Sequence, residues 1–515
     1  MSGQRINTRL EWNSQLSTDI NPNQIRKSSI ICTIGPATQS VDMLVKLLEA
    51  GMNIMRMNFS HGTHEYHTIT IENLRAAAKL ANIPTVGIAL DTKGPEIRTG
   101  NMKNGDVPFN AGHEMIFTLD EKFKDEGDLN QIFIDYRNLS KVLSPGKIIY
   151  IDDGIMEFKV LECHDDHVKV VAVNSGTLAS HKGVNLPGSN VDLPALSEKD
   201  ISDLKFGIKM GVDMIFASFI RTANDVLEIR KVLGEEGKGI KIVSKIESTQ
   251  GVENFDDILK VTDSVMIARG DLGIEIPPAK VFLAQKSMIA KCNVAGVPVI
   301  VATQMLESMT YNPRPTRAEI SDVANAIIDG ADCVMLSGET AKGKYPLEAV
   351  KMMSETAILA EMSINHLNLY RDLRTAVHSS LNTTEATCAS AVDVSFDQKA
   401  KLIICLTTSG ESARLLSKYR PDAPILVLTR QPRIARNAHL NRGCFPIHYV
   451  SPKPDLNSDI PVERDQWQVD VENRIQFAID HAISRGLCQK GDKVVSIQGW
   501  RGGVGNTNTM RILTA

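Results

Sequence analysis

The sequence predicts an α/β protein built on a (β/α)8 TIM barrel, with an inserted all-β lid domain and a C-terminal open α/β domain. Three observations support this prediction. Eight apolar segments of strand length alternate with helix-length patterns, and such alternation implies a parallel sheet that eight units can close into a barrel. Residues 95–193 instead have the pattern of short alternating strands, and the alternation of strands and helices resumes over 373–515.

Each of the eight apolar segments has glycine, a hydroxyl, an amide or a charged residue at or next to its end. Barrel enzymes hold their active sites at the carboxyl ends of the strands, so we expect the site there. The segments are 28–34, 53–59, 85–91, 214–219, 242–246, 265–268, 298–303 and 333–336. The chain is thereby divided into an N-terminal segment (1–25), a catalytic barrel (26–94 and 194–372), a β-barrel-like lid (95–193) and a C-terminal effector domain (373–515).

The insert follows the third barrel segment. Short strands are predicted at 115–117, 132–134, 148–150 and 168–171, and Asp-Asp-Gly at 152–154 predicts a turn between two of them. An insertion without a functional role is one interpretation. Because the insert leaves and re-enters the barrel near the proposed site, we favour a lid.

Composition limits the possible functions. A chain of 515 residues exceeds one core, and its net charge of −4 gives no electrostatic reason to expect nucleic acid or an anionic membrane as partner. No apolar run approaches the roughly 18 residues of a membrane span. The eight cysteines are scattered without paired spacing, which predicts neither a disulfide framework nor a zinc site. We therefore expect a reducing compartment, the cytoplasm.

Two consecutive strands end in chemically active residues. The segment 242–246 contains Lys245 and is followed by Glu247, and the segment 265–268 is followed, after Arg269 and Gly270, by Asp271. Strand residues alternate faces, so Lys245 and Glu247 project to one side, and a neighbouring parallel strand brings Asp271 close. A cation beside two carboxylates suits a divalent metal and a phosphate. The alternative is a buried ion pair that only closes a core, which is costly to bury without a function.

Polar groups also follow the second and third segments. Arg56, Asn58 and Ser60 share one face, and Asp91 and Thr92 end the next segment. Their oxygens could coordinate a monovalent cation, although side-chain type alone does not distinguish K⁺ from Mg²⁺. Capping of the following helices is an equally good explanation of each segment alone.

Two further segments carry hydroxyls. Thr303, after the seventh strand, faces the barrel mouth and could relay a proton, or could only satisfy a helix N-terminus. In the C-terminal domain, Thr407, Thr408, Ser409, Gly410 and Ser412 precede or begin a helix, which forms a phosphate cradle or a plain capped helix. The basic loop 499–505 favours the anion site. No Walker A sequence occurs.

Five ordered motifs together resemble pyruvate kinase, in its eukaryotic and fungal-like form. They cover 55–62, 90–98, 244–247, 268–275 and 302–309, and the resemblance extends from about Ser28 to the C-terminus. It implies transfer of a phosphoryl group from phosphoenolpyruvate to ADP, giving pyruvate and ATP. It further implies Mg²⁺ (or Mn²⁺) and K⁺ as cofactors, and a homotetramer.

The resemblance also implies a role for each matching residue. Arg56 would bind the transferring phosphate, Lys245 would stabilise its charge, and Thr303 would lie near the enolate face that is protonated. The substrate carboxylate would meet backbone N–H groups at Gly270 and Asp271. The remaining roles are Mg²⁺ binding by Glu247 and Asp271, K⁺ binding by Asn58, Ser60, Asp91 and Thr92, and nucleotide binding by Asn58, His61, Arg98 and Lys182.

The C-terminal domain resembles the effector domain that binds fructose 1,6-bisphosphate. The matching residues are Thr407, Thr408, Ser409, Gly410, Ser412, Trp467, Arg474 and Gly499. The neutral Thr408 favours activation. Glu411 departs from the family pattern, because an acid beside a phosphate weakens binding.

Two rival functions remain open on the sequence. A Schiff-base aldolase on the same barrel would use Lys245 as nucleophile, which requires an uncharged lysine. A metabolite-sensing scaffold would use only the C-terminal domain.

Overall fold

The computed structural model describes residues 8–19, 25–377, 380–452, 462–501 and 503–515. Its centre is a closed barrel of eight parallel strands in the order β1-β17-β16-β15-β14-β13-β3-β2, which confirms the predicted fold class. Each barrel strand coincides with one of the eight predicted segments. The strands are β1 (Ser29–Thr33), β2 (Met52–Asn58), β3 (Gly87–Asp91), β13 (Met214–Ala217), β14 (Lys241–Ile246), β15 (Ser264–Ala268), β16 (Val299–Ala302) and β17 (Cys333–Leu336).

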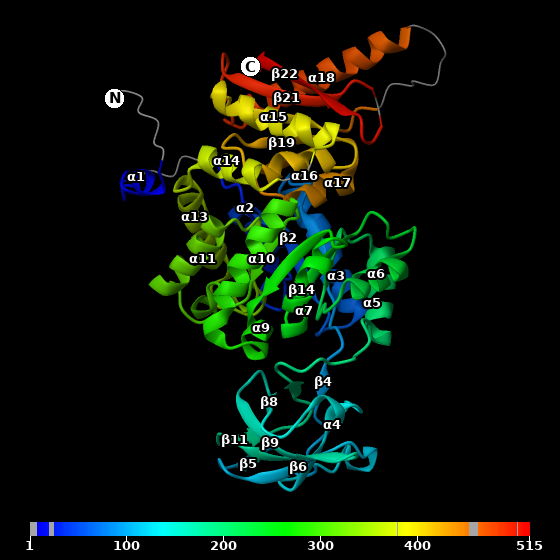
Figure 1. Cartoon of the computed structure of the whole chain (residues 1–515). Helices are drawn as coiled ribbons and strands as arrows, with labels where there is room; N and C mark the ends of the chain where they lie inside the picture. Colours follow the sequence, from blue (N-terminus) through cyan, green and yellow to red (C-terminus); the bar gives the residue numbers. More distant parts are fainter. Residues whose placement is uncertain (1–7, 20–24, 378–379, 453–461, 502) are drawn as a thin grey trace.

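Helices surround the barrel (Figure 1), and the longer ones bury an apolar face against the strands. Between β14 and β15 the sequence predicted one helix, whereas the chain forms two short ones that are separated at Asn254. Thr316 and Glu319 form a capping box at the start of α11. The barrel helices are α2 (Val41–Ala50), α3 (His64–Leu80), α5 (Glu198–Met210), α6 (Ala223–Leu233), α7 (Thr249–Glu253), α8 (Phe255–Leu259), α9 (Arg269–Glu275), α10 (Val281–Ala295), α11 (Arg317–Asp329), α12 (Gly338–Ala341) and α13 (Pro346–Met362).

The insert between β3 and α5 forms its own β-structure and its own hydrophobic core. Asp152, Asp153 and Gly154 all have positive φ, as the predicted turn requires. A seven-stranded sheet has the order β4 (Ile97–Arg98), β12 (Gly183–Asn185), β8 (Ile148–Ile151), β9 (Met156–Cys163), β10 (His167–Ala172), β6 (Glu114–Thr118) and β7 (Gln131–Phe133), beside a pair formed by β11 (Gly176–Leu178) and β5 (Val107–Phe109).

The C-terminal region is an open five-stranded sheet with helices on its faces. Its expected start at residue 373 falls inside α14 (His366–Ala376), because Tyr370 and Leu373 of that helix pack in the C-terminal core. The sheet order is β20 (Cys444–His448), β19 (Ile425–Thr429), β18 (Leu402–Leu406), β21 (Lys493–Gly499) and β22 (Thr507–Thr514), with β22 antiparallel. The helices are α15 (Thr383–Asp397), α16 (Glu411–Lys418), α17 (Pro432–Asn437) and α18 (Val462–Ser484).

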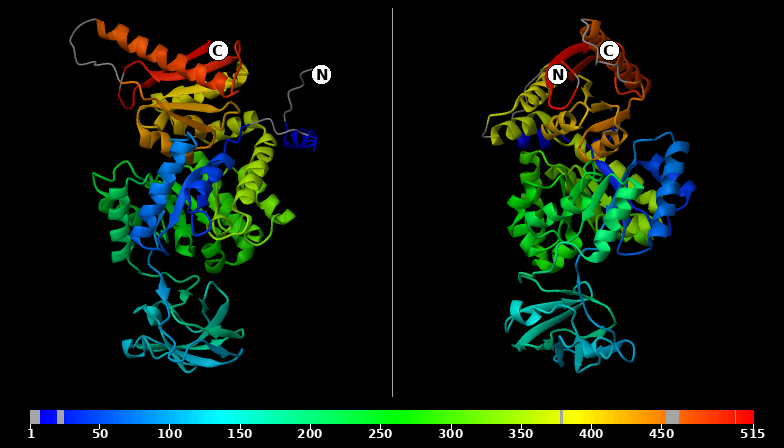
Figure 2. Two further views of the ribbon diagram at one scale, coloured as in Figure 1. Left: turned by 180° about the vertical axis from the view of Figure 1, so that it is seen from behind. Right: turned by 90° about the vertical axis from the view of Figure 1, so that its right-hand side faces the viewer.

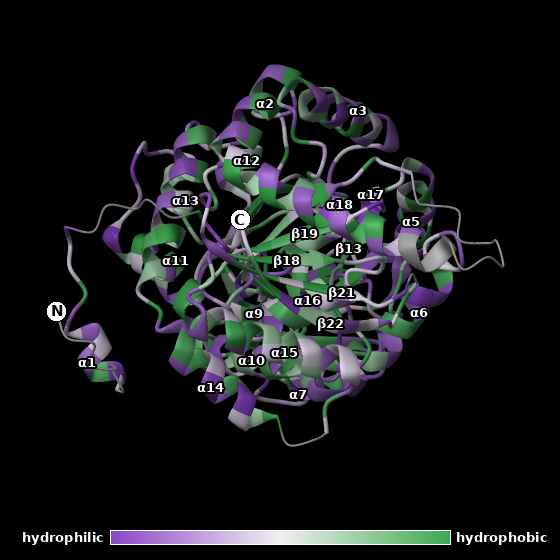
Figure 3. Cartoon of the chain, turned by 90° about the horizontal axis from the view of Figure 1, so that it is seen from above, coloured by the Kyte–Doolittle hydropathy of each residue, from purple (hydrophilic) through white to green (hydrophobic). Residues whose placement is uncertain are grey.

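The lid and the C-terminal region lie at opposite ends of the barrel (Figures 1 and 2). Seen along the long axis of the molecule, the strands near the centre are mostly hydrophobic, and the helices at the rim carry both hydrophilic and hydrophobic residues (Figure 3). Among the described residues, no helix combines the length and apolar character needed to cross a membrane. Because the lid lies at the end of the barrel where the strands have their carboxyl ends, the predicted site residues face the lid.

Candidate active site

Lys245 lies near the end of β14 and is the centre of the site. Its side chain is buried, and its Nζ lies 3.1 Å from Asp91 Oδ1 and 3.0 Å from Glu247 Oε1. Lys245 and Glu247 thus project to one side of the strand, as the alternation of faces predicted. Burial lowers the pKa of Lys245, but attraction to Asp91 and Glu247 outweighs burial and holds the pKa above its usual value. Lys245 is therefore a fixed positive charge.

Arg56, at the end of β2, supplies a second buried cation. Its Nε donates to Asp91 Oδ2 at 2.6 Å and its Nη1 donates to Thr33 Oγ1 at 2.9 Å. Burial raises the pKa of Asp91, yet Arg56 and Lys245 together keep it below its usual value. One carboxylate thus holds two cations side by side at the barrel mouth, an arrangement suited to an anion with several negative oxygens.

Glu247 and Asp271 form a crowded pair of carboxyl groups beside these cations. Helix α9 begins at Arg269, directly after β15, and so brings Asp271 to the barrel mouth. Burial, followed by repulsion from Glu247, raises the pKa of Asp271 to about 7. Two adjacent oxygen ligands that repel one another fit a hard divalent cation, which typically takes one or two carboxylates together with substrate oxygens. The donor set therefore fits Mg²⁺ or Mn²⁺.

Thr303 follows β16 in a strained conformation. Its φ is 75° and that of Gln304 is 58°, in the left-handed region that non-glycine residues seldom occupy. A Cβ on Gly270 would lie 2.9 Å from Thr303 Cγ2, so residue 270 must be glycine for this approach. Arg269 fixes the turn, because its Nη2 donates to the Thr303 carbonyl at 2.7 Å. Strain of this kind concentrates at functional sites.

The four residues matched to K⁺ binding lie at or just after the ends of the adjoining strands β2 and β3. Asn58 and Asp91 are register partners on β2 and β3. Asn58 Oδ1 accepts a hydrogen bond from the Ser60 amide at 3.0 Å, so this side chain also serves as a turn cap. Thr92 is buried beside Asp91. The donors are all oxygen and include one ionised carboxylate, which fits a monovalent cation.

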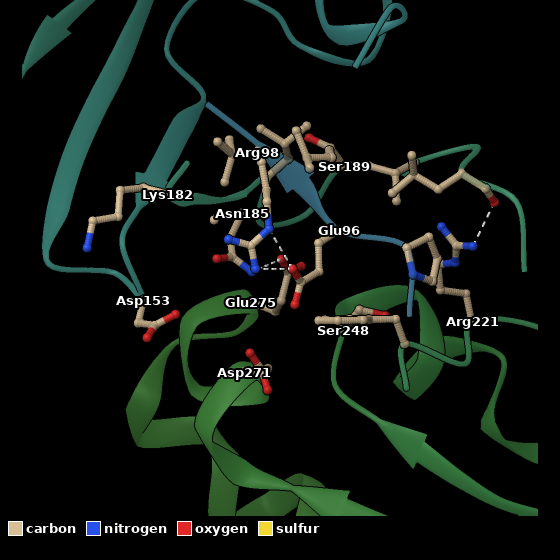
Figure 4. Close-up of a pocket in the computed structure, with 18 of the residues that line it drawn as sticks. Glu96, Arg98, Asp153, Lys182, Asn185, Ser189, Arg221, Ser248, Asp271 and Glu275 are labelled. Carbon is tan, nitrogen blue, oxygen red and sulfur yellow. Dashed lines mark hydrogen bonds and ion pairs between the residues drawn. The ribbon is translucent and has the colours of Figure 1, made fainter. Parts of the chain in front are cut away.

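A cavity of about 360 Å³ separates the lid from the barrel (Figure 4). Arg98 and Lys182 reach it from the lid and Asp271 from the barrel. Both lid cations are paired: Arg98 Nε lies 2.8 Å from Glu96 Oε2, and Lys182 Nζ lies 3.0 Å from Asp152 Oδ1. Of the four residues matched to the nucleotide, Asn58 and His61 are not among the described residues that line this cavity.

A second cavity, of about 100 Å³, lies in the C-terminal region. A cation stacks on an aromatic ring there, with the Arg474 guanidinium 5.2 Å from the Trp467 ring centroid. Arg474 Nη2 is buried and has no hydrogen-bond partner within the described chain. Gly410 does not line the cavity but caps α16 with a φ of 86°. The predicted effector residues that line it are Thr407, Thr408, Ser409, Ser412, Trp467, Arg474 and Gly499.

Glu411, the departure from the family pattern, also lines this second cavity. Its carboxylate is held by Arg414, whose Nε lies 3.0 Å from Glu411 Oε2. Because this pair compensates the acid, Glu411 opposes a bound phosphate less than an isolated carboxylate would.

Sequence reasoning missed Ser218, Phe219 and Glu275. Ser218 and Phe219 end the predicted segment 214–219 and contact Lys245 and Glu247. Their position at a strand end was the available signal. Glu275 lines the lid cavity, and burial raises its pKa to about 7.

Comparisons with known proteins agree with this geometry. The family model "Pyruvate kinase, barrel domain" matches residues 25–350, and "Pyruvate kinase, alpha/beta domain" matches residues 385–513. A pyruvate kinase of Kluyveromyces lactis is 58% identical over 99% of this chain and 100% of its own length. Those of Candida albicans (57%; 98% and 99%) and Agaricus bisporus (55%; 99% and 96%) are similar. The chain therefore belongs to the pyruvate kinase family of phosphotransferases.

Proposed function

We propose that this enzyme transfers the phosphoryl group of phosphoenolpyruvate to ADP, giving ATP and pyruvate. The observation that carries the proposal is the pair of buried cations, Arg56 and Lys245, held by Asp91 next to the Glu247–Asp271 carboxyl pair. Phosphoryl transfer needs little covalent help from the protein, so a site that positions cations around one phosphate suffices.

The cationic side chains and the oxygen ligands have different roles in the transfer. Arg56 orients the phosphate, and Lys245 neutralises the charge that develops on it during transfer. Glu247 and Asp271 would hold Mg²⁺ or Mn²⁺, which supplies positive charge to phosphate and enolate oxygens. Asn58, Ser60, Asp91 and Thr92 would hold K⁺, which adds further charge at the phosphate.

The other residues bind substrate and nucleotide. The first turn of α9 has no side-chain cap, so the amides of Gly270 and Asp271 are available to a carboxylate. The Thr303 hydroxyl lies next to that turn and would assist protonation of the enolate. Arg98 and Lys182 would contact the nucleotide phosphates from the lid, together with Asn58 and His61 on the barrel side. A closed lid would exclude water.

The rival aldolase is disfavoured by the charge of Lys245. A Schiff-base lysine must lose its proton, whereas Asp91 and Glu247 raise the pKa of Lys245. Borohydride trapping in the presence of a carbonyl substrate decides between the two reactions. A metabolite-sensing scaffold would leave the strained Thr303 and the buried cations without a function.

Regulation is part of the proposal. The unpartnered Arg474 Nη2 and the surrounding hydroxyls support binding of fructose 1,6-bisphosphate as an activator. We also propose a homotetramer in the cytoplasm; the eight cysteines are free, and seven of them are buried, as in proteins of a reducing compartment.

A coupled pyruvate-formation assay tests these statements together. Turnover should require ADP, phosphoenolpyruvate and Mg²⁺ or Mn²⁺, and should rise on addition of K⁺. Fructose 1,6-bisphosphate should shift the phosphoenolpyruvate saturation curve to lower concentration. An unchanged curve would refute activation alone, whereas no turnover under any of these conditions would refute the proposed reaction.

A further inference from the structure

Ser218 and Phe219, directly after β13, contact Lys245, Thr92 and Glu247 of the proposed catalytic centre. The Ser218 hydroxyl accepts a hydrogen bond from Lys245 Nζ at 2.8 Å and donates to the Thr92 carbonyl oxygen at 2.6 Å. The Ser218 amide donates to Thr92 Oγ1 at 3.1 Å. Both oxygens of Thr92 are therefore tied to the residue that also holds Lys245.

Phe219 makes the corresponding contact to the carboxyl pair. Its amide donates to Glu247 Oε2 at 2.7 Å. This contact requires an unusual backbone, because Phe219 has a φ of 54°. A bulky residue in the left-handed region is strained, and such strain persists only where the surroundings enforce it.

Gly94, the last barrel residue before the lid, permits this conformation. A Cβ on Gly94 would lie 2.8 Å from Ser218 Cβ and 3.0 Å from Phe219 Cδ2. Gly94 itself has a φ of 74°. The chain that enters the lid thus packs directly on the Ser218–Phe219 turn. This close contact is possible only because Gly94 has no side chain.

We propose that Ser218 and Phe219 form a positioning element for phosphoryl transfer. The Ser218 hydroxyl orients the Lys245 ammonium and couples it to the Asp91–Thr92 monovalent-cation ligands, while the Phe219 amide orients Glu247. Neither residue is required to touch substrate. The inference rests on the proposed function and adds a link between the K⁺ ligands and the cation that acts on the phosphate.

The coupling has a geometric basis. Ser218 Oγ lies 3.2 Å from Asp91 Oδ1, and Asp91 is also the carboxylate shared by Arg56 and Lys245. A cation bound at Asp91 and Thr92 therefore acts on Lys245 through two paths, the shared carboxylate and the serine hydroxyl. Removing the hydroxyl leaves only the first path and frees one N–H of Lys245.

Ser218→Ala tests the proposal, with Ser264→Ala as the matched control. Ser264 is likewise a buried serine, at the start of β15, and its hydroxyl donates to the Pro298 carbonyl at 2.8 Å, away from the site residues. Ser218→Ala removes a hydrogen bond to the charged Lys245 ammonium, so its kcat should fall about 10- to 100-fold. The K⁺ concentration for half-maximal activity should rise several-fold, as should the K⁺ concentration that half-maximally raises the melting temperature, and KM for phosphoenolpyruvate should change little.

Ser218→Cys fills the same site with a slightly larger side chain that is a weak donor and a weak acceptor, so it should show the same K⁺ shift. Its melting temperature should stay close to that of the wild type. This variant replaces Ser218→Ala in the test if Ser218→Ala folds poorly. A K⁺ activation curve and kcat equal to those of Ser264→Ala would overturn the proposal, as would a lower kcat with an unshifted K⁺ curve. A wild-type enzyme without turnover would instead refute the proposed function itself.

Discussion

At the scale of single residues, Lys245 keeps a full charge in a buried site because carboxylates surround it. Removing water from an ammonium group is costly, and Asp91 and Glu247 offset that cost at 3.1 and 3.0 Å. The charge is thus in place before substrate arrives, with no reorganisation needed during the reaction. The same arrangement makes Lys245 difficult to replace.

Lys245→Met should remove transition-state stabilisation of about 3–4 kcal/mol, or about 10²–10³ in kcat, because a preorganised cation is lost. KM for phosphoenolpyruvate should change little, since Arg56 remains to bind the phosphate. Steady-state kinetics measure both values. Lys241→Met is the control, because Lys241 begins the same strand and pairs with Asp263 at 2.9 Å. An effect on KM alone would contradict the assigned role.

Burial of Glu275 gives the protein a pH-dependent stability. Its folded pKa of about 7 exceeds the ordinary 4.5, so its stabilising contribution is complete below pH 4.5 and is lost as the pH rises through 7. Glu275→Gln should therefore be more stable than the wild type at pH 8, by about 1–3 kcal/mol, with the difference vanishing near pH 4.5. Urea unfolding at several pH values measures this. The exposed Glu236→Gln should show no such trend.

At the scale of elements, α9 connects the lid to the carboxyl pair. Asp271 lies in its first turn, and Glu275 at its end accepts a hydrogen bond from lid residue Asn185, 3.3 Å away. The lid turn at Gly154 also approaches Ile274, since a Cβ there would lie 3.6 Å from that side chain. Lid position and the placement of Asp271 are therefore linked through one short helix.

Asn185→Ala should weaken the lid contact without touching the cations of the mouth. A neutral hydrogen bond contributes about 0.5–1.5 kcal/mol, so KM for ADP should rise about 2- to 10-fold while kcat is largely kept. Initial-rate kinetics with varied ADP measure the effect. Asn104→Ala, an exposed lid residue, is the control. A KM for ADP equal to that of the control would exclude a role for this contact in nucleotide binding.

The sequence predicted the barrel strands well because each is a continuous apolar run at helix-length spacing. Strands β4, β11 and β12 could not be predicted, since each is two or three residues long and none is a continuous apolar run like the predicted 132–134. Strand β9 was not predicted, although its buried Met156, Phe158 and Val160 alternate with more exposed residues and so carry the period of a strand. The Ser218–Phe219 turn depends on a positive φ enforced by contact with Gly94, which no local pattern in the sequence encodes.

Across the full chain, the C-terminal region packs against the end of the barrel opposite the lid. Arg420 forms a buried bidentate pair with Asp332, which precedes β17 (Nη1–Oδ1 2.5 Å, Nη2–Oδ2 3.0 Å). Leu440 lies in the cluster of inward-facing barrel side chains that includes Ile31, Met266 and Met335. Because they share a core, the two regions stabilise each other.

Leu440→Ala should lower the free energy of unfolding of the barrel by about 2–5 kcal/mol, because Leu440 is 2% exposed and its truncation leaves a cavity in the barrel floor. Amide hydrogen exchange in β1 and β17 should accelerate, and the urea midpoint should fall. The kcat should remain near that of the wild type, since the catalytic residues lie at the opposite strand ends. Leu227→Ala, on α6 and 53% exposed, is the control. If both variants lost equal stability, Leu440 would contribute no more to folding than an exposed side chain, which would contradict a core shared by the two regions.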